Sequence, residues 1–330
     1  MTRPALVPDL STLTLREATP AEKVLCWRIN AASWAGRLTV DDYVLRETIN
    51  GSGLLTGNGG IKYWVSVGSH ITGGQDGESG GGEVIYASVE SLWKEIVVRD
   101  GEGVRREGCW AIASVFTPEK WRRRGIAAQM MRKLAEWFDG EGGGGEYYSP
   151  LGWSSFPSLE THLPPGSSHS TDAKPLAASD LPPLCDRDVA AIIQDIRDAP
   201  LMPGTHTRLA FLPSYAQAEW HFGAEDHVAS KLFTDRMPEV KGAISQSGET
   251  WGYWVHDFTE NILLFLRLVS LYPPSSSAEE EKAILELSDV LRAAQVEAAT
   301  WAFKSVVLWN PDRRTLGACK LALGLGEGEE

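Results

Sequence analysis

One segment of the chain combines residue types that could bind a phosphorylated ligand. Arg122, Gly125 and Ala127 occur at the spacing Arg-x-x-Gly-x-Ala, after the strand-like run Cys109–Thr117 and at the start of the amphipathic, helix-like stretch Gly125–Phe138. Gly125 permits a tight turn and Ala127 leaves room at the helix start. Because the first N–H groups of a helix are unpaired and the helix dipole is positive there, such a turn suits a pyrophosphate.

Other phosphate-binding loops fit this turn poorly. A dinucleotide fold needs three glycines in the turn, and a nucleotide-binding P-loop needs Gly-Lys-Ser/Thr, whereas this turn has Gly125 alone. A loop for coenzyme A remains. Arg124 and Arg132 could reach phosphates, although arginines exposed on a helix are usually only solvated. The helix itself presents an apolar stripe that predicts packing on a sheet, formed by Ile126, Met130, Met131, Leu134 and Phe138.

The strand Ile112–Thr117, the turn Arg122–Ala127 and the following helix resemble the GNAT superfamily of acetyl-CoA-dependent N-acetyltransferases. A second match, Tyr147–Trp153, is similar to the Tyr-x-x-Leu-Gly-Trp ending of that fold. The resemblance implies an α+β (mixed α/β) GNAT fold with acetyl-CoA as co-substrate. It also implies that a splayed strand and the turn hold acetyl-CoA through Val115, Phe116, Thr117, Arg122, Arg123, Arg124, Gly125, Ile126 and Ala127.

A narrower resemblance covers most of the chain. The stretches that carry it look like the fungal lysine N-acetyltransferase family: Ala18–Lys23, Trp27–Asn30, Trp34, Asp41–Tyr43, Gly59–Trp64, Gly152–Pro157 and Trp309–Pro311. This family resemblance implies a second, GNAT-like C-terminal half. It also implies direct transfer of an acetyl group to the side-chain amine of free L-lysine, in lysine catabolism.

Two residues are candidates for the proton transfers. The acceptor amine must lose a proton before it attacks, since the pKa of a free lysine side chain is about 10.4. Glu90 is a candidate base, and the ordinary alternative is a glutamate exposed on a strand. Tyr148 falls where the superfamily often has the tyrosine that protonates the leaving thiolate, and the alternative is a core tyrosine.

The chain departs from the GNAT pattern after Phe138. A full strand normally separates the phosphate-loop helix from the Tyr-x-x-Leu-Gly-Trp segment, whereas here only the glycine-rich tract Asp139–Glu146 lies between them. We therefore expect a shortened domain that lacks one core strand. The alternatives to an active lysine acetyltransferase are a catalytically impaired GNAT-like protein that binds acyl-CoA or a partner, and an acetyltransferase acting on proteins or peptides.

Composition limits the function classes. The formal net charge of −13 over 330 residues argues against a nucleic-acid partner. The cysteines Cys26, Cys109, Cys185 and Cys319 form no CxxC pair, and the histidines form no metal-binding motif, so we expect no metal. Scattered cysteines, the absence of a signal-like apolar run and the absence of a membrane-spanning one favour a cytoplasmic protein with no membrane partner.

Residue patterns also predict the domain organisation. We expect a GNAT domain over residues 1–160, a Pro- and Ser-rich linker over 161–183 and a second α/β domain over 184–330. Residues 20–50 look helical, with a start at Pro20 and a second short helix over Val40–Ile49. Further helices are predicted over Asp186–Arg197, around Ser214–Phe222, over Ala278–Phe303 and near Arg313–Leu323. The predicted strands cover Lys62–Val67, Glu83–Ser91, Cys109–Thr117, Trp251–Asp257, Asn261–Leu271 and Ser305–Trp309.

The two halves echo each other weakly. Each contains a Tyr-Trp-Val strand, at Tyr63–Val65 and at Tyr253–Val255, followed by a further strand and a helix. An internal repeat and a coincidence between common α/β segments both explain the pattern. In the second half, His256 and Asp257 lie near the end of a predicted strand and are candidate contributors to the acceptor pocket.

Overall fold

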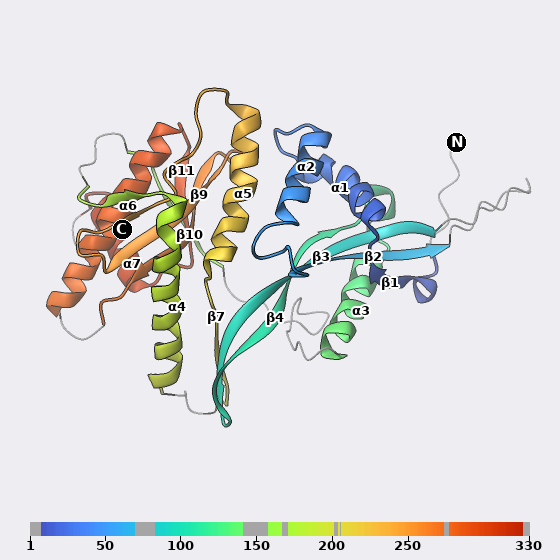
Figure 1. The fold of residues 1–330 in the computed structure, drawn as a ribbon, viewed down its shortest axis with the longest axis horizontal. Coiled ribbons are helices and arrows are strands. Elements are labelled where there is room, and N and C mark those ends of the chain that lie inside the picture. Colours follow the sequence, from blue (N-terminus) through green and yellow to red (C-terminus); the bar gives the residue numbers. More distant parts are fainter. Residues whose placement is uncertain are drawn as a thin grey trace, which may run out of the picture. The chain divides into compact units, whose positions relative to one another are not determined.

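The chain folds into two units, Met1–Ser155 and Phe156–Glu330, each built around its own β-sheet (Figure 1). The structure is a computed structural model that describes residues 8–69, 83–140, 158–166, 171–200, 204, 206–273 and 277–325. The Gly-rich tract after residue 140 and the Tyr147–Trp153 motif lie outside these residues.

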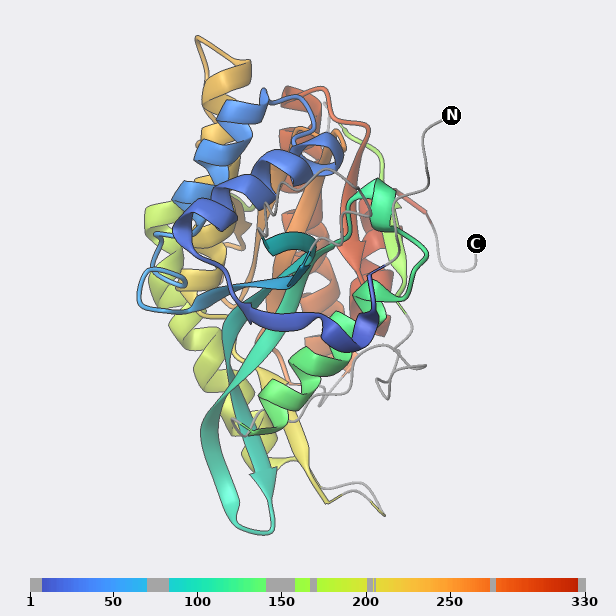
Figure 2. The same ribbon diagram turned by 90° about the vertical axis from the view of Figure 1, so that its right-hand side faces the viewer.

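The strands of the first unit follow the order β1-β2-β3-β4, and each neighbouring pair is antiparallel. The elements of this unit are β1 (Thr14–Glu17), α1 (Pro20–Trp34), α2 (Val40–Asn50), β2 (Ile61–Ser69), β3 (Glu83–Asp100), β4 (Gly103–Phe116) and α3 (Ile126–Gly140). Helices α1 and α2 cover one face of the sheet and α3 covers the other, as both ribbon views show (Figures 1 and 2).

Local sequence signals explain where these helices begin. Thr19 and Glu22 form a reciprocal capping box at the start of α1, with Pro20 in the first helical position, where its missing N–H costs nothing. The Thr39 side chain caps α2 by accepting the backbone N–H of Asp42. The predicted apolar stripe of α3 is confirmed, because all five of its side chains are buried against the sheet.

In the second unit the sheet order is β5-β11-β10-β9-β8-β6, and only the β10–β11 pair is parallel among the described strands. Its elements are β5 (Glu160–Leu163), β6 (Lys174–Leu176), α4 (Leu181–Asp198), β7 (Arg208–Phe211), α5 (Tyr215–Leu232), β8 (Gly242–Ile244), β9 (Thr250–Asp257), β10 (Ile262–Ser270), α6 (Ser277–Thr300), β11 (Ser305–Trp309) and α7 (Arg313–Ala322). Helices α4 and α5 pack with the side chain of Trp251 in one hydrophobic cluster, and α6 and α7 pack with that of Trp254 in another.

Described parts of the segment 161–183, expected to be a linker, instead form strands of the second sheet and the start of a helix. Its residues supply most of β5 and all of β6, and α4 begins at Leu181 rather than at Asp186. Both strands lie at the edges of the sheet, where short strands and a proline such as Pro175 are tolerated. Prolines in the first turn of α4 are compatible with a helix, so the Pro-rich sequence marks a helix start.

The paired Tyr-Trp-Val strands do not occupy equivalent places. Tyr63–Val65 lies in β2, two strands before the helix α3, whereas Tyr253–Val255 lies in β9, one strand before the helix α6. The two halves are instead similar in the order of their elements, because each has an antiparallel strand pair, β3–β4 or β9–β10, followed by a long helix. The predicted hairpin over Trp251–Asp257 and Asn261–Leu271 is confirmed as β9 and β10.

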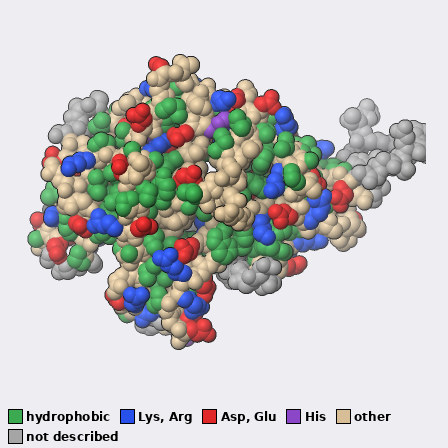
Figure 3. All heavy atoms as spheres, viewed as in Figure 1, with side chains coloured by type: hydrophobic (Ala, Val, Ile, Leu, Met, Phe, Trp, Pro, Cys, Tyr) green, Lys and Arg blue, Asp and Glu red, His purple; other side chains and the backbone are tan. Residues whose placement is uncertain are grey.

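None of the helices within the described residues is both long enough and apolar enough to cross a lipid bilayer. On the face drawn in Figure 3, acidic and basic side chains are interspersed with hydrophobic ones.

The packing of α3 gives the first prediction. Leu134→Ala removes a fully buried side chain, and we expect it to lower the free energy of unfolding of the first unit by about 3 kcal/mol. Glu136→Ala, two residues away on the exposed face of the same helix, is the control and should change it by less than about 0.5 kcal/mol. Denaturant unfolding measures both values, and equal losses in the two variants would contradict this packing.

Candidate active site

The site begins at a β-bulge in β4. Ser88 of β3 lies opposite Phe116 and Glu90 lies opposite Ala113, so β4 contains one residue more than β3 over this interval. Ser114 takes up the extra length with a left-handed backbone, φ 53°. A bulge re-aims the side chains that follow it and ends regular pairing, so the end of β4 is directed away from the ladder.

A short loop connects the bulged strand to α3. It contains the 3-10 turn Glu119–Trp121 and two residues in the left-handed region, Arg123 at φ 61° and Gly125 at φ 78°. Gly125 accommodates this φ without a side-chain penalty, whereas Arg123 carries strain of roughly 1–2 kcal/mol. The Gly125 carbonyl accepts the Gln129 N–H at 3.0 Å, which starts the helical ladder and leaves the N–H groups of the first turn available to a ligand.

Bulge, loop and helix start enclose a cavity of about 520 Å³. Eight of the nine residues predicted to hold acetyl-CoA line it: Val115, Phe116, Thr117, Arg122, Arg123, Gly125, Ile126 and Ala127. The exception is Arg124, whose guanidinium lies 5.3 Å from the centre of the Trp121 ring. The sequence interpretation missed four lining residues, Ser33, Trp34, Trp121 and Ala128.

Buried polar atoms beside this cavity favour a polar ligand. Thr117 Oγ1 and Trp121 Nε1 are buried without a hydrogen-bond partner among the described residues. The Arg122 Nε donates to the Thr117 carbonyl at 3.0 Å and so fixes the loop. An elongated ligand with amide groups and an anionic end matches these donors, the helix start and the cavity volume.

Glu90 lies beneath the bulge and is buried, which corrects the alternative of an exposed strand glutamate. Burial raises the pKa of its carboxyl group to about 7, and the neighbouring Glu47 carboxylate adds to the rise. Interactions with the side chains of Ser114 and Trp27 lower this pKa and so offset part of the rise. Glu47 is itself held by Arg46 at 2.6 Å. A carboxyl group with this pKa can accept and release a proton near neutral pH.

The surroundings of Glu90 hold unused hydrogen-bonding capacity. Trp27 Nε1, Asn30 Oδ1 and Tyr63 Oη are buried and have no hydrogen-bond partner of good geometry among the described residues. All three residues and Glu90 line a cavity of about 10 Å³, which is close to the space that one water molecule needs. Helix α1 and strands β2 and β3 therefore build a polar pocket on the face of the sheet opposite α3.

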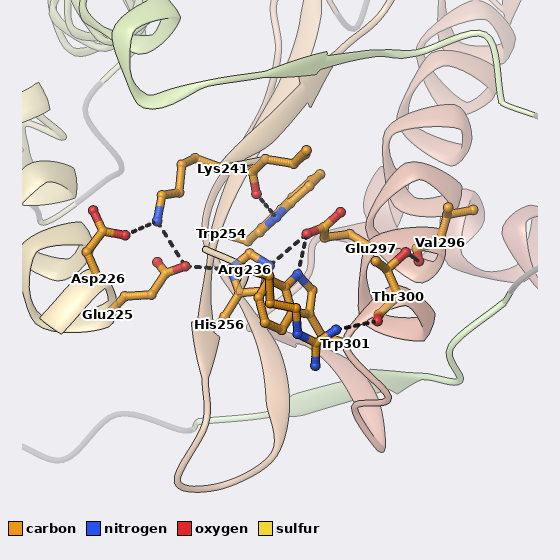
Figure 4. Close-up of polar contacts among 11 residues, drawn as sticks. Glu225, Asp226, Arg236, Lys241, Trp254, His256, Val296, Glu297, Thr300 and Trp301 are labelled. Atoms are coloured by element: carbon orange, nitrogen blue, oxygen red, sulfur yellow. Dashed lines mark hydrogen bonds and ion pairs between the residues drawn. The ribbon is translucent and has the colours of Figure 1, made fainter. Parts of the chain in front are cut away.

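The second-half candidates, His256 and Asp257, make contacts within their own unit. His256 lies in the second unit, fully buried between Glu225 of α5 and Glu297 of α6, at 2.6 and 2.9 Å (Figure 4). Lys241 bonds the same Glu225 oxygen at 3.0 Å, and the Trp301 indole donates to Glu297 at 2.8 Å. Asp257 accepts backbone N–H groups of the turn that follows β9. These contacts describe a structural ion network.

Tyr148, the candidate acid, lies outside the described residues. Within the described parts of the chain, no group of three or more His, Cys, Asp or Glu side chains is placed to hold a metal ion.

The first unit matches a known class. Residues 86–149, which contain the bulged strand and the loop, match the model of the acetyltransferase (GNAT) family. The N-myristoyltransferase of Saccharomyces cerevisiae with bound myristoyl-CoA is 10% identical, with a TM-score of 0.50, over 99% of this chain and 78% of that one. A GCN5-related N-acetyltransferase from Kribbella flavida is 15% identical with a TM-score of 0.43, and this chain spans 66% of its length. The family match over the bulged strand and the loop assigns this unit to the GNAT N-acetyltransferases.

The second unit identifies the family more closely. Residues 156–329 match the LYC1 GNAT-like C-terminal domain. A lysine acetyltransferase from Yarrowia lipolytica is 21% identical over 366 aligned residues, which cover 91% of this chain and 85% of that protein. The chain belongs to the LYC1-like family of GNAT acetyltransferases.

The ion network around His256 gives the second prediction. Burial opposes the charged imidazolium, but the hydrogen bonds to Glu225 and Glu297 outweigh burial and raise the pKa of His256. Because the pKa of His256 is higher in the folded chain than in the unfolded chain, protonation of His256 stabilises the fold. This stabilisation is complete below the unfolded-state pKa of about 6.5 and is lost as the pH rises through the folded-state pKa. We therefore expect His256→Gln to lower the free energy of unfolding at pH 6 by about 3 kcal/mol.

The same variant should flatten the fall in stability between pH 6 and pH 9, measured by denaturant unfolding. His206→Gln, at an exposed position, is the control and should keep the wild-type slope. A His256→Gln slope equal to that of the wild type would show that His256 is not the titrating group.

Proposed function

We propose that this chain transfers the acetyl group of acetyl-CoA to the side-chain amine of free L-lysine. The observation that carries the proposal is the bulged β4 and the turn at Gly125 that leads into α3, which together form the cavity of about 520 Å³. The choice of lysine is supported by the similarity to a lysine acetyltransferase. The net charge of −13 also favours a cationic acceptor.

In this proposal the first unit, expected over residues 1–160, is the acetyl-CoA-binding domain. The N–H groups of Ile126 and Ala127 bind the pyrophosphate together with the positive end of α3, and Arg122, Arg123 and Arg124 add positive charge around it. The backbone of Val115, Phe116 and Thr117, beyond the bulge, pairs with the pantetheine arm. An N–H group of the same segment stabilises the oxyanion of the thioester in the transition state.

Glu90 acts as the general base. It takes a proton from the acceptor ammonium, directly or through one water in the small cavity. The amine nitrogen then attacks the thioester carbonyl carbon, so that a C–N bond forms, the C–S bond breaks and the thiolate leaves. We assign Tyr148 as the acid that protonates the thiolate, and the tyrosinate then takes up the second proton that the nitrogen loses as the amide forms.

We also propose that the reaction takes place in the cytoplasm. All four cysteines are free thiols, and burial raises the pKa of Cys26, Cys185 and Cys319 to about 11. Such thiols are poorly nucleophilic and suit a reducing compartment.

The third prediction concerns the base. Glu90→Gln should lower kcat with L-lysine by about 10²–10⁴-fold and remove the rise in rate with pH that the wild type shows through about pH 7. Glu95→Gln, in the same strand but with a half-exposed side chain, is the control and should keep rate and pH profile. A retained pH profile in Glu90→Gln would exclude this residue as the base, and a wild-type chain without turnover would favour the catalytically impaired alternative.

The fourth prediction concerns the turn. Gly125→Val places a β-branched side chain at φ 78°, with its Cβ 3.3 Å from Leu10 Cδ1, so we expect the Kd for acetyl-CoA to rise about tenfold or more. Gly101→Val, in the exposed β3–β4 turn with open space around its Cβ, is the control. Calorimetric titration with acetyl-CoA measures both, and an unchanged Kd in Gly125→Val would contradict a pyrophosphate site at this turn.

A further inference from the structure

The second unit contains two parallel strands that begin paired and then separate. β10 pairs with β11 over Ile262–Leu264, and beyond this the two strands no longer pair with each other: β10 continues to Ser270 paired only with β9, and β11 continues to Trp309 paired only with β5. An extra residue between Phe265 and Arg267 shifts the register of β10 against β9 at this point. Beyond the paired part, no strand of the described chain pairs with β10 on the β11 side.

Two cavities lie along this part of β10, with volumes of about 530 and 280 Å³, and the larger one is lined by β10, α4, β7 and the start of α7. The smaller one is lined by both strands, including Leu266 of β10 and Leu308 of β11. The two cavities share Arg267, Leu268, Asp312 and Thr315, so they form one continuous cleft. The Ser270 hydroxyl lines the larger cavity and is buried without a hydrogen-bond partner among the described residues.

An open strand edge selects an extended ligand. The N–H and C=O groups along such an edge alternate, so they can form hydrogen bonds with the backbone of an extended peptide that lies beside the strand. The free part of β10, Phe265–Ser270, is about 20 Å long at 3.4 Å per residue. This length matches a peptide segment of about six residues.

Charge argues against a polyanion such as coenzyme A in this cleft. The first turn of α6, which follows β10 as α3 follows β4, carries Glu279 and Glu280. The three lining arginines are already paired with carboxylates: Arg267 binds Asp188 through two bonds of 2.7 and 2.8 Å, Arg208 binds Asp195 at 3.1 Å, and Arg314 binds Glu280.

Asp312 favours a cation instead. Its Oδ1 accepts the Thr315 N–H at 2.7 Å as the cap of α7, and within the described residues it forms no ion pair. Because it lines both cavities, its carboxylate is available to a basic side chain at the middle of the cleft.

We propose that the cleft between β10 and β11 binds an extended basic segment of another polypeptide. The segment adds as a strand to the free edge of β10 and places a lysine or arginine against Asp312. This site lies within the second unit and does not depend on the acetyl-transfer reaction proposed above.

A binding experiment on the full chain tests this. The probes are a fluorescent peptide of eight alternating lysine and threonine residues and a matched peptide with glutamate in place of lysine, both measured by anisotropy with acetyl-CoA at saturation. We expect the basic peptide to bind at least about tenfold more tightly. We also expect it to slow hydrogen exchange of backbone amides within Phe265–Ser270.

Asp312→Asn keeps the helix cap but removes the charge, so it should raise the Kd of the basic peptide about tenfold. Asp235→Asn removes an equal charge from an exposed position and should change the Kd by less than twofold. The proposal is overturned if neither peptide binds, if both bind equally, if exchange within β10 is unchanged, or if the two variants have the same effect.

Discussion

The bulge at Ser114 is the constraint on which the first unit depends. Because β4 gains one residue there, its last residues leave the ladder and the chain enters the loop to α3 in a new direction. Two further left-handed residues, Arg123 and Gly125, complete the turn. The buried side chains of Trp121 and Ile126 anchor the loop at both ends, so the strain at Ser114 and Arg123 is held by the core.

The same bulge lies between Glu90 and the large cavity. Ser114 and its neighbours face in two directions: the Ser114 side chain approaches Glu90 and its small polar cavity, and Val115 and Phe116 line the large one. The buried Glu90 carboxyl group and the large cavity are therefore joined by adjacent residues of one strand. Burial, with Glu47 nearby, raises the pKa of Glu90 to about 7, which suits the role of base that we propose for it.

Sequence reasoning located the turn and helix because their signals are local: a glycine at the turn and an apolar stripe along α3. It could not place Glu90, since a period-two strand pattern does not distinguish a face covered by α1 from an exposed one. The bulge was also invisible, because Ser114 lies in an ordinary run of strand residues. The short edge strands β5 and β6 were missed because Pro175 and the polar residues around it have a loop-like composition.

Each unit encloses a titratable side chain whose proton affinity depends on the fold. The pKa of Glu90 is raised from an ordinary 4.5 to about 7, and that of His256 is raised by its two carboxylates. Near neutral pH both groups hold more protons in the folded chain than in the unfolded one, so unfolding releases protons to the buffer. Calorimetric enthalpies of unfolding for this protein consequently include the ionisation heat of the buffer, and they become comparable only after that heat is subtracted.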